Sequence, residues 1–283
     1  MESTNCYIVH DNTYGQLVKI SKINKAYVPE MLIEHLKSVV MTSQSLKKNS
    51  QETAVFVNQT NYITMYGLGK DETSSFNLAW TDNVKISDFH LVSYNKIITL
   101  SYLGCLRIYR YNVVKEESEL LSQFKILEGS QISTMPGMDQ ESNFHMMSFC
   151  SMTQVCLIAS RMESNLNHQA FFLVKVSDLD NNPRFKFLSK TTEYAFNPKK
   201  QYFKVLGNFG MFEGNPIFFG IGFTNQKTRL YSFAFNLKTQ DLGDFKDPKE
   251  IDLGLCECVC FGEEFYWAID EHGSTARIGL NYC

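Results

Sequence analysis

Apolar and polar residues alternate most regularly between Val84 and Leu127. In this stretch, turn residues separate runs that are rich in β-branched and aromatic side chains. The four runs are Val84–Val92, Lys96–Tyr102, Cys105–Tyr111 and Leu120–Leu127. In the two middle runs, apolar residues recur at every second position, which places them on one face of a strand. The pattern predicts one four-stranded antiparallel sheet.

The turn between the two middle strands is predicted at Leu103 and Gly104. A branched leucine tolerates positive φ poorly, whereas glycine adopts it without steric cost. We therefore expect a type I turn in which Gly104 takes the left-handed conformation and closes a bulge.

The same kind of hairpin recurs along the whole chain. A small sheet that is apolar on both faces is not stable alone, so it must stack between neighbours. Hairpins are predicted at Cys6–Ile20, Thr53–Gly67, Lys96–Tyr111, Gln154–Val176, Pro216–Leu237 and Glu264–Leu280. Spacings of about 40 to 50 residues with four strands each are typical of β-propeller blades. The two longest spacings require insertions, which we place at Met162–His168 and Lys190–Lys200.

The expected fold is therefore all-β, a β-propeller of about six four-stranded antiparallel blades, with five to seven admitted. Residues 1–283 are predicted to form a single domain, because a closed ring can reach this length as one unit. In this interpretation the first unit lacks an inner strand and the last lacks an outer one. An N-terminal segment that completes the last blade would explain both and would give five blades; we prefer six.

The segment Pro29–Val40 interrupts the strand pattern. Its apolar residues at positions 32, 36, 39 and 40, with a proline near the start, are compatible with a short helix over one face of the ring. An outer strand followed by the next inner strand is an equally good interpretation.

The stretch Val84–Arg110 resembles a degenerate WD-repeat blade. Gly104, Leu106, Ile108 and Tyr109 match the ending of that repeat, whereas Leu103 and Arg110 stand where the repeat has aspartates. No Gly-His pair precedes the blade, so the resemblance does not imply the family's Asp-His hydrogen-bond network. The hairpin at Pro216–Leu237 is equally similar to a kelch hairpin. Both resemblances imply a ring of blades and no particular ligand.

Composition narrows the classes of partner. The net charge of −3 and a pI of about 6.1 create no overall field that would favour nucleic acid or an anionic membrane. The start lacks a basic region followed by an apolar run, and no apolar stretch approaches the roughly 20 residues of a membrane-spanning helix. We expect a cytoplasmic or nuclear protein with eight reduced cysteines.

Several local patterns look like binding motifs, but each has a plainer structural interpretation. Cys256, Cys258 and Cys260 would lie on one side of a strand about 6.5 Å apart, too far for one tetrahedral zinc, so we expect a buried or channel-facing strand. The stretches Gly67–Thr73 and Asp178–Asn182 resemble phosphate-binding and calcium-binding loops but lack their essential residues, and we expect turns. We predict no metal and no cofactor.

The sequence contains no nucleophile elbow and no zinc-protease motif. Some propellers are glycosidases that use carboxylates around the central channel. If this chain were such an enzyme, Asp88 would be the carboxylate to inspect, because it is predicted to lie at an inner-strand end.

One predicted insertion mixes aromatic and basic residues. Tyr194, Phe196, Lys199 and Lys200 all lie between Lys190 and Gln201. Loops on a rigid scaffold often carry binding residues, and aromatic side chains beside cations suit protein partners. The plainer interpretation of this loop is that both rings fold back onto the blade. Chiefly from the expected propeller fold, we predict a non-catalytic scaffold within a larger assembly that binds other protein subunits. A glycoside-hydrolase-like enzyme and an RNA-associated propeller are the alternatives.

Overall fold

The structure is a computed structural model of the chain. It describes residues 6–10, 15–23, 26–36, 43–48, 51–58, 63–67, 75–77, 85–93, 95–112, 115, 117–126, 142–162, 169–191, 202–224, 227–253, 256–261, 265–270 and 275–279.

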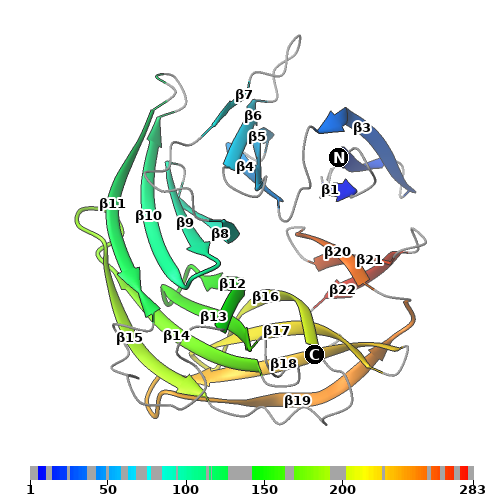
Figure 1. The fold of residues 1–283 in the computed structure, drawn as a ribbon. Helices are drawn as coiled ribbons and strands as arrows, with labels where there is room; N and C mark the ends of the chain where they lie inside the picture. The colour runs from blue at the N-terminus through cyan, green and yellow to red at the C-terminus, as the bar shows by residue number, and fades with distance from the viewer. Residues whose placement is uncertain are drawn as a thin grey trace.

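The described strands form six antiparallel sheets, which are arranged as a ring (Figure 1). Each sheet consists of strands that are consecutive in the sequence. The first sheet contains β1 (Cys6–His10), β2 (Gly15–Ile23) and β3 (Ala26–Leu36). The second contains β4 (Ser43–Lys48), β5 (Gln51–Asn58), β6 (Ile63–Gly67) and β7 (Ser75–Asn77).

The third and fourth sheets have four strands each. The third contains β8 (Ile86–Ser93), β9 (Lys96–Ser101), β10 (Cys105–Asn112) and β11 (Glu117–Lys125). The fourth contains β12 (Ser142–Cys150), β13 (Val155–Met162), β14 (Gln169–Ser177) and β15 (Arg184–Thr191). The fold predicted from the sequence is thus confirmed as all-β.

The fifth and sixth sheets complete the ring. The fifth contains β16 (Tyr202–Phe212), β17 (Asn215–Thr224), β18 (Lys227–Asn236) and β19 (Asp241–Ile251). The sixth contains β20 (Cys256–Phe261), β21 (Phe265–Asp270) and β22 (Thr275–Gly279). The first strand of each sheet contacts the first strands of its neighbours, and β1 contacts both β4 and β20. The ring therefore closes between the first and sixth sheets.

The predicted hairpins coincide with pairs of strands in all six sheets. In five sheets the hairpin joins the second and third strands, as expected. In the first sheet, Cys6–Ile20 instead forms β1 and most of β2, and β1 is the inner strand. The expectation that the first unit lacks an inner strand is therefore wrong. Among the described strands β1 pairs with β2 and not with the last sheet, so these strands form six blades, as preferred from the sequence.

The interpretation of Pro29–Val40 as a short helix is also wrong, because the strand β3 runs from Ala26 to Leu36. Pro29 lies opposite Ile20 in the pairing of β3 with β2. Proline lacks an N–H group and is accepted in sheets on edge strands, and among the described strands β3 is at the edge of its sheet. The alternative of an outer strand is confirmed for residues 29–36, and residues 37–40 lie outside the described residues.

The turn between β9 and β10 has the predicted conformation. Gly104 has a φ of 75°, and its N–H donates to the Ser101 carbonyl at 2.9 Å. The glycine is also needed for packing, since a Cβ built there would lie 2.6 Å from Cδ2 of the Phe144 ring in the next sheet. Gly104 thus combines a turn conformation with close contact between sheets.

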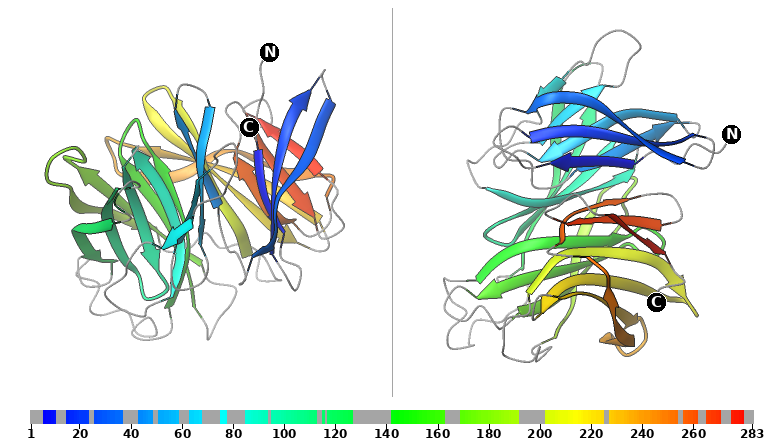
Figure 2. Two further views of the ribbon diagram at one scale, coloured as in Figure 1. Left: turned by 90° about the horizontal axis from the view of Figure 1, so that it is seen from above. Right: turned by 90° about the vertical axis from the view of Figure 1, so that its right-hand side faces the viewer.

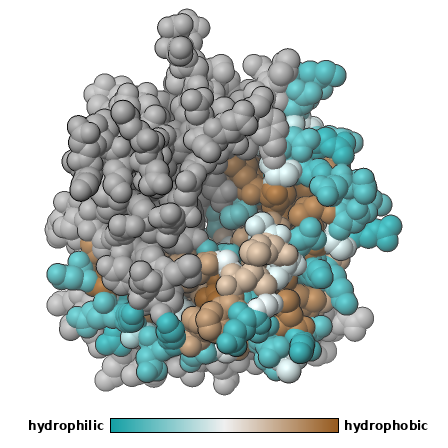
Figure 3. Space-filling view, turned by 180° about the vertical axis from the view of Figure 1, so that it is seen from behind, coloured by the Kyte–Doolittle hydropathy of each residue, from teal (hydrophilic) through white to brown (hydrophobic). Residues whose placement is uncertain are grey.

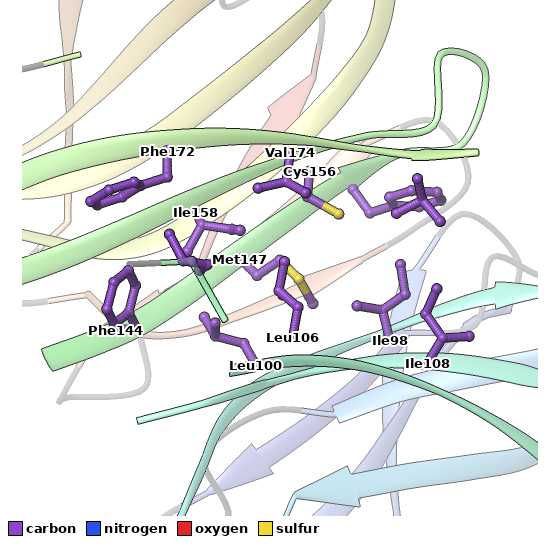
Figure 4. Close-up of a cluster of buried hydrophobic side chains, with 13 residues drawn as sticks. Ile98, Leu100, Leu106, Ile108, Phe144, Met147, Cys156, Ile158, Phe172 and Val174 are labelled. Carbon is purple, nitrogen blue, oxygen red and sulfur yellow. The ribbon is translucent and has the colours of Figure 1, made fainter. Parts of the chain in front are cut away.

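The core consists of layers between neighbouring sheets, which Figure 2 shows packed face to face. In β14, Phe172 and Val174 pack against the third sheet, whereas Phe171 and Leu173 pack against the fifth. This alternation explains the continuous apolar sequence of β14, because both of its faces are buried. Figure 4 shows the layer between the third and fourth sheets, where Ile98 and Leu106 face Met147.

Candidate functional site

Asp88 forms a polar link between two inner strands. It lies on β8, its side chain is buried, and Oδ2 accepts a hydrogen bond of 2.7 Å from the N–H of Met147 on β12. Oδ1 accepts one of 2.8 Å from the N–H of Phe89. An inner strand has N–H groups that point away from its own sheet and need acceptors. Asp88 supplies one, so its carboxylate is committed to a structural contact.

His90 lies two residues after Asp88 on β8 and packs against the same neighbouring strand. Its ring centroid is 5.5 Å from that of Phe149 on β12, with the two planes inclined at 55°. His90 is partly buried, and the loss of water around its imidazole beside this aromatic ring lowers the pKa of His90 from 6.5 to about 4. The imidazole is therefore neutral near pH 7.

Lys96 provides a second polar link between the third and fourth sheets. Its side chain is buried, and its ammonium donates to the carbonyls of Leu179 and Asp180, the latter at 3.0 Å. Both carbonyls belong to the turn between β14 and β15. A charged donor to two carbonyls is stronger than a neutral hydrogen bond, so this contact fixes the position of the turn.

That turn contains the segment whose sequence resembles a calcium loop. Oδ1 of Asp178 accepts from the side-chain amide of Asn181 at 3.2 Å, and Oδ2 accepts from the N–H of Asn182 at 3.3 Å. The aspartate therefore closes a surface turn, as predicted. In the described part of the chain, no group of three or more His, Cys, Asp or Glu residues is placed to hold a metal.

The cysteines that the structure describes in full are buried. Cys105, Cys150 and Cys156 are free thiols, and burial raises the pKa of Cys156 above its usual range. The segment Cys256–Phe261 is the strand β20, as predicted, although its side chains lie outside the described part. A low thiolate content makes Cys156 an unreactive core residue.

The predicted partner-binding residues Tyr194, Phe196, Lys199 and Lys200 lie outside the described residues. The same holds for most of the two predicted insertions and for residues 68–73 of the phosphate-loop-like stretch. The partner-binding prediction is therefore untested. The segment with the four residues connects β15, which ends at Thr191, to β16, which begins at Tyr202.

One face of the ring carries exposed apolar side chains at its turns. We call it face A and define it by the turns at 151–154, 178–183, 213–214 and 237–240, where β12, β14, β16 and β18 end. Met152 is 75% exposed, Phe212 51% and Leu237 38%. Figure 3 shows the molecule from behind without labels on these residues; in that view the described residues expose hydrophilic side chains at the rim and hydrophobic ones further in.

Contacts between the strand ends bring together the turns that carry these three residues on face A. The thiol of Cys150 lies 3.8 Å from the sulfur of Met211, so the ends of β12 and β16 meet just before Met152 and Phe212. Phe212 pairs with Asn215, whose Oδ1 accepts a hydrogen bond of 3.1 Å from the N–H of Leu237. No sequence pattern indicated this region, because the residues come from three separate turns.

No helix among the described residues is long and apolar enough to cross a membrane.

Comparison with known proteins supports the fold and leaves the family open. No protein-family model matches the sequence, and no curated protein matches it. Among solved structures, the β-propeller domain of Cps50 (Swd1) from Myceliophteria thermophila is similar, with a TM-score of 0.57 and 9% sequence identity. The match covers 97% of this chain and 80% of that one. At this identity the likeness concerns the fold alone. The chain therefore has the all-β fold of a β-propeller.

Proposed function

We propose that the protein is a non-catalytic, WD-repeat-like β-propeller scaffold that binds other proteins as a subunit of a larger assembly. The observation that carries the proposal is that buried polar side chains of one blade bind the backbone of the next blade. The buried polar side chains Asp88 and Lys96 on the third sheet bind backbone groups of the fourth sheet, so they fix these two blades against each other. A rigid ring of this kind holds its turns and loops in fixed positions, which suits a binding platform.

The same observation weighs against the glycosidase alternative. Asp88 is the carboxylate that the sequence pointed to, and both of its oxygens accept backbone N–H groups. A general acid or nucleophile needs an oxygen that faces the substrate. Asp88 therefore supports the scaffold function and not hydrolysis.

The proposal is tested by the native size of the protein. A tagged copy would be captured from lysate of its own cells and sized, and co-purifying chains would be identified. A subunit should elute far above its own mass of 32.6 kDa with partners in fixed ratio. A lone monomer would contradict the proposal. Imaging of the same tagged copy tests the predicted cytoplasmic or nuclear location.

The connection between β15 and β16 is the proposed partner-binding loop. The double variant Tyr194→Ala and Phe196→Ala removes two large apolar rings that suit a protein interface. We expect it to reduce the recovery of co-purifying chains at least tenfold while leaving thermal stability unchanged. The matched control is Leu103→Ser, which alters an exposed leucine in another turn. Equal recovery with both variants would assign binding to a different surface.

A further inference from the structure

We propose that Met152, Phe212 and Leu237 form a docking surface for a segment of a partner protein that carries hydrophobic side chains next to arginine or lysine. This inference rests on the proposed scaffold function and names a surface and a partner chemistry for it. Four observations support it: exposure, clustering, the aromatic environment of Phe212, and local charge.

Exposure and clustering together distinguish these side chains from ordinary surface residues. Single exposed apolar residues are common and need no explanation, but contiguous ones mark interaction sites. Among the residues whose side-chain exposure the structure describes, five large hydrophobic side chains are exposed, and three of them lie on face A. The contact of Cys150 with Met211 and the hydrogen bond of Leu237 to Asn215 connect the three positions.

The environment of Phe212 favours a cation. Its ring meets that of Phe245 edge-on, with centroids 5.1 Å apart. The ammonium of Lys246 lies 5.4 Å from the centroid of Phe245, so this aromatic pair already interacts with one cation from its own chain. The exposed half of Phe212 offers a second aromatic surface of the same kind to a cation from outside.

The charges beside these side chains are mostly acidic. In the four turns and the first residue of β19, the acidic residues are Asp178, Asp180, Glu213 and Asp241, against the base Lys238. Asp244 and Lys246, which flank Phe245, add one charge of each sign. Lys175 and Arg184 flank the turn with the first two aspartates, so the acidic excess centres on Glu213 and Asp241. Glu213 follows Phe212 directly, and a carboxylate next to an aromatic ring suits a guanidinium or ammonium group. Charge thus favours a basic partner over an acidic one.

The experiment selects ligands from random sequences, so the partner need not be identified first. A library of random 12-residue peptides displayed on phage is selected on the immobilised full chain. Enriched peptides are synthesised, and their Kd is measured by fluorescence anisotropy with the wild type and with variants. We expect enriched sequences to combine apolar residues with arginine or lysine, and their binding to weaken as salt is raised.

Three variants test the surface. Phe212→Ser and the pair Met152→Ser with Leu237→Ser should each raise the Kd at least tenfold, and Glu213→Lys should do so without removing apolar surface. Leu103→Ser, at the turn between β9 and β10, is the matched control and should leave the Kd unchanged. Circular dichroism and melting curves identify any variant that fails to fold, and in that case Glu213→Lys, an exposed position, still tests the site.

Several outcomes would overturn the inference. These are an absence of enriched peptides, enrichment of acidic peptides, or binding that the face A variants leave intact. Concentration-dependent dimers that Phe212→Ser abolishes would show that the occupant is a second copy of this chain. A large native particle unaffected by these variants would reject the surface and keep the scaffold function, whereas a native monomer would reject the scaffold function itself.

Discussion

Gly104 and Gly214 both adopt positive φ, at 75° and 80°, but their surroundings differ. A Cβ at Gly104 would collide with the ring of Phe144, whereas a Cβ at Gly214 would meet nothing within 4 Å. A comparison of substitutions at the two glycines therefore separates the free-energy cost of the backbone conformation from that of crowding between sheets.

Alanine at each glycine measures these two costs. Gly214→Ala should lower the free energy of unfolding by about 1 kcal/mol, the usual cost of left-handed backbone for an L-residue. Gly104→Ala should lose about 1 to 3 kcal/mol more, because overpacking forces the Phe144 ring to move. Urea titrations of both variants measure the difference. Equal losses would show that the sheets adjust to the extra methyl group without strain.

His90 should make the stability of the protein depend on pH. Its pKa is about 4 in the folded protein and about 6.5 when exposed, so the unfolded chain binds more protons between these values. The contribution is fully present above pH 6.5 and is lost as the pH falls toward 4. At pH 5 the expected loss is at most about 2 kcal/mol relative to pH 7.

Urea titrations at pH 7 and pH 5 test this contribution. His90→Gln removes the titrating group, so the free energy of unfolding of that variant should fall less between the two pH values than that of the wild type. If the two proteins lose the same stability, other groups cause the pH dependence.

At the scale of the elements, the sheets are joined by polar contacts as well as by apolar layers. Asp88→Ala leaves the N–H groups of Met147 and Phe89 without their acceptor, and we expect a loss of about 2 to 3 kcal/mol in the free energy of unfolding. Asp88→Asn keeps one carbonyl oxygen and should lose less. Asp180→Ala, at an exposed position, is the control and should change stability by less than about 0.5 kcal/mol. Thermal or urea unfolding measures all three; unchanged stability of Asp88→Ala would contradict the structural role.

The elements were largely predictable from local sequence, and the contacts between them were not. Alternation and turn residues act over a few positions, which is why the strands around Gly104 were placed correctly. The segment Pro29–Val40 was ambiguous, because its apolar spacing fits a helix as well as a strand, and the pairing of β3 with β2 decides between them. Asp88 was noticed as a carboxylate on an inner strand, but its partner Met147 is 59 positions away. No local sequence pattern predicts a contact between residues so far apart in the sequence. For the same reason, the contacts of Lys96 and the grouping of the three face A residues could not be predicted.

At the scale of the whole molecule, the single domain predicted for residues 1–283 implies one cooperative unfolding transition. The two tryptophans, Trp80 and Trp267, are distant in sequence and provide separate probes. We expect the single-tryptophan variants Trp80→Phe and Trp267→Phe to give the same urea midpoint by fluorescence as by circular dichroism of the same sample. Separate midpoints for the two probes would divide the ring into independently unfolding parts.

Each sheet is built from strands that are consecutive in the sequence, and this affects how the chain folds during synthesis. Since among the described strands no sheet contains one from a distant part of the chain, each blade can pair these strands as soon as it leaves the ribosome. Only the meeting of β20 with β1 requires the two ends of the ring to find each other. We therefore expect closure to be the last step of folding, with the inner strands at the two ends accessible to chaperones until it occurs.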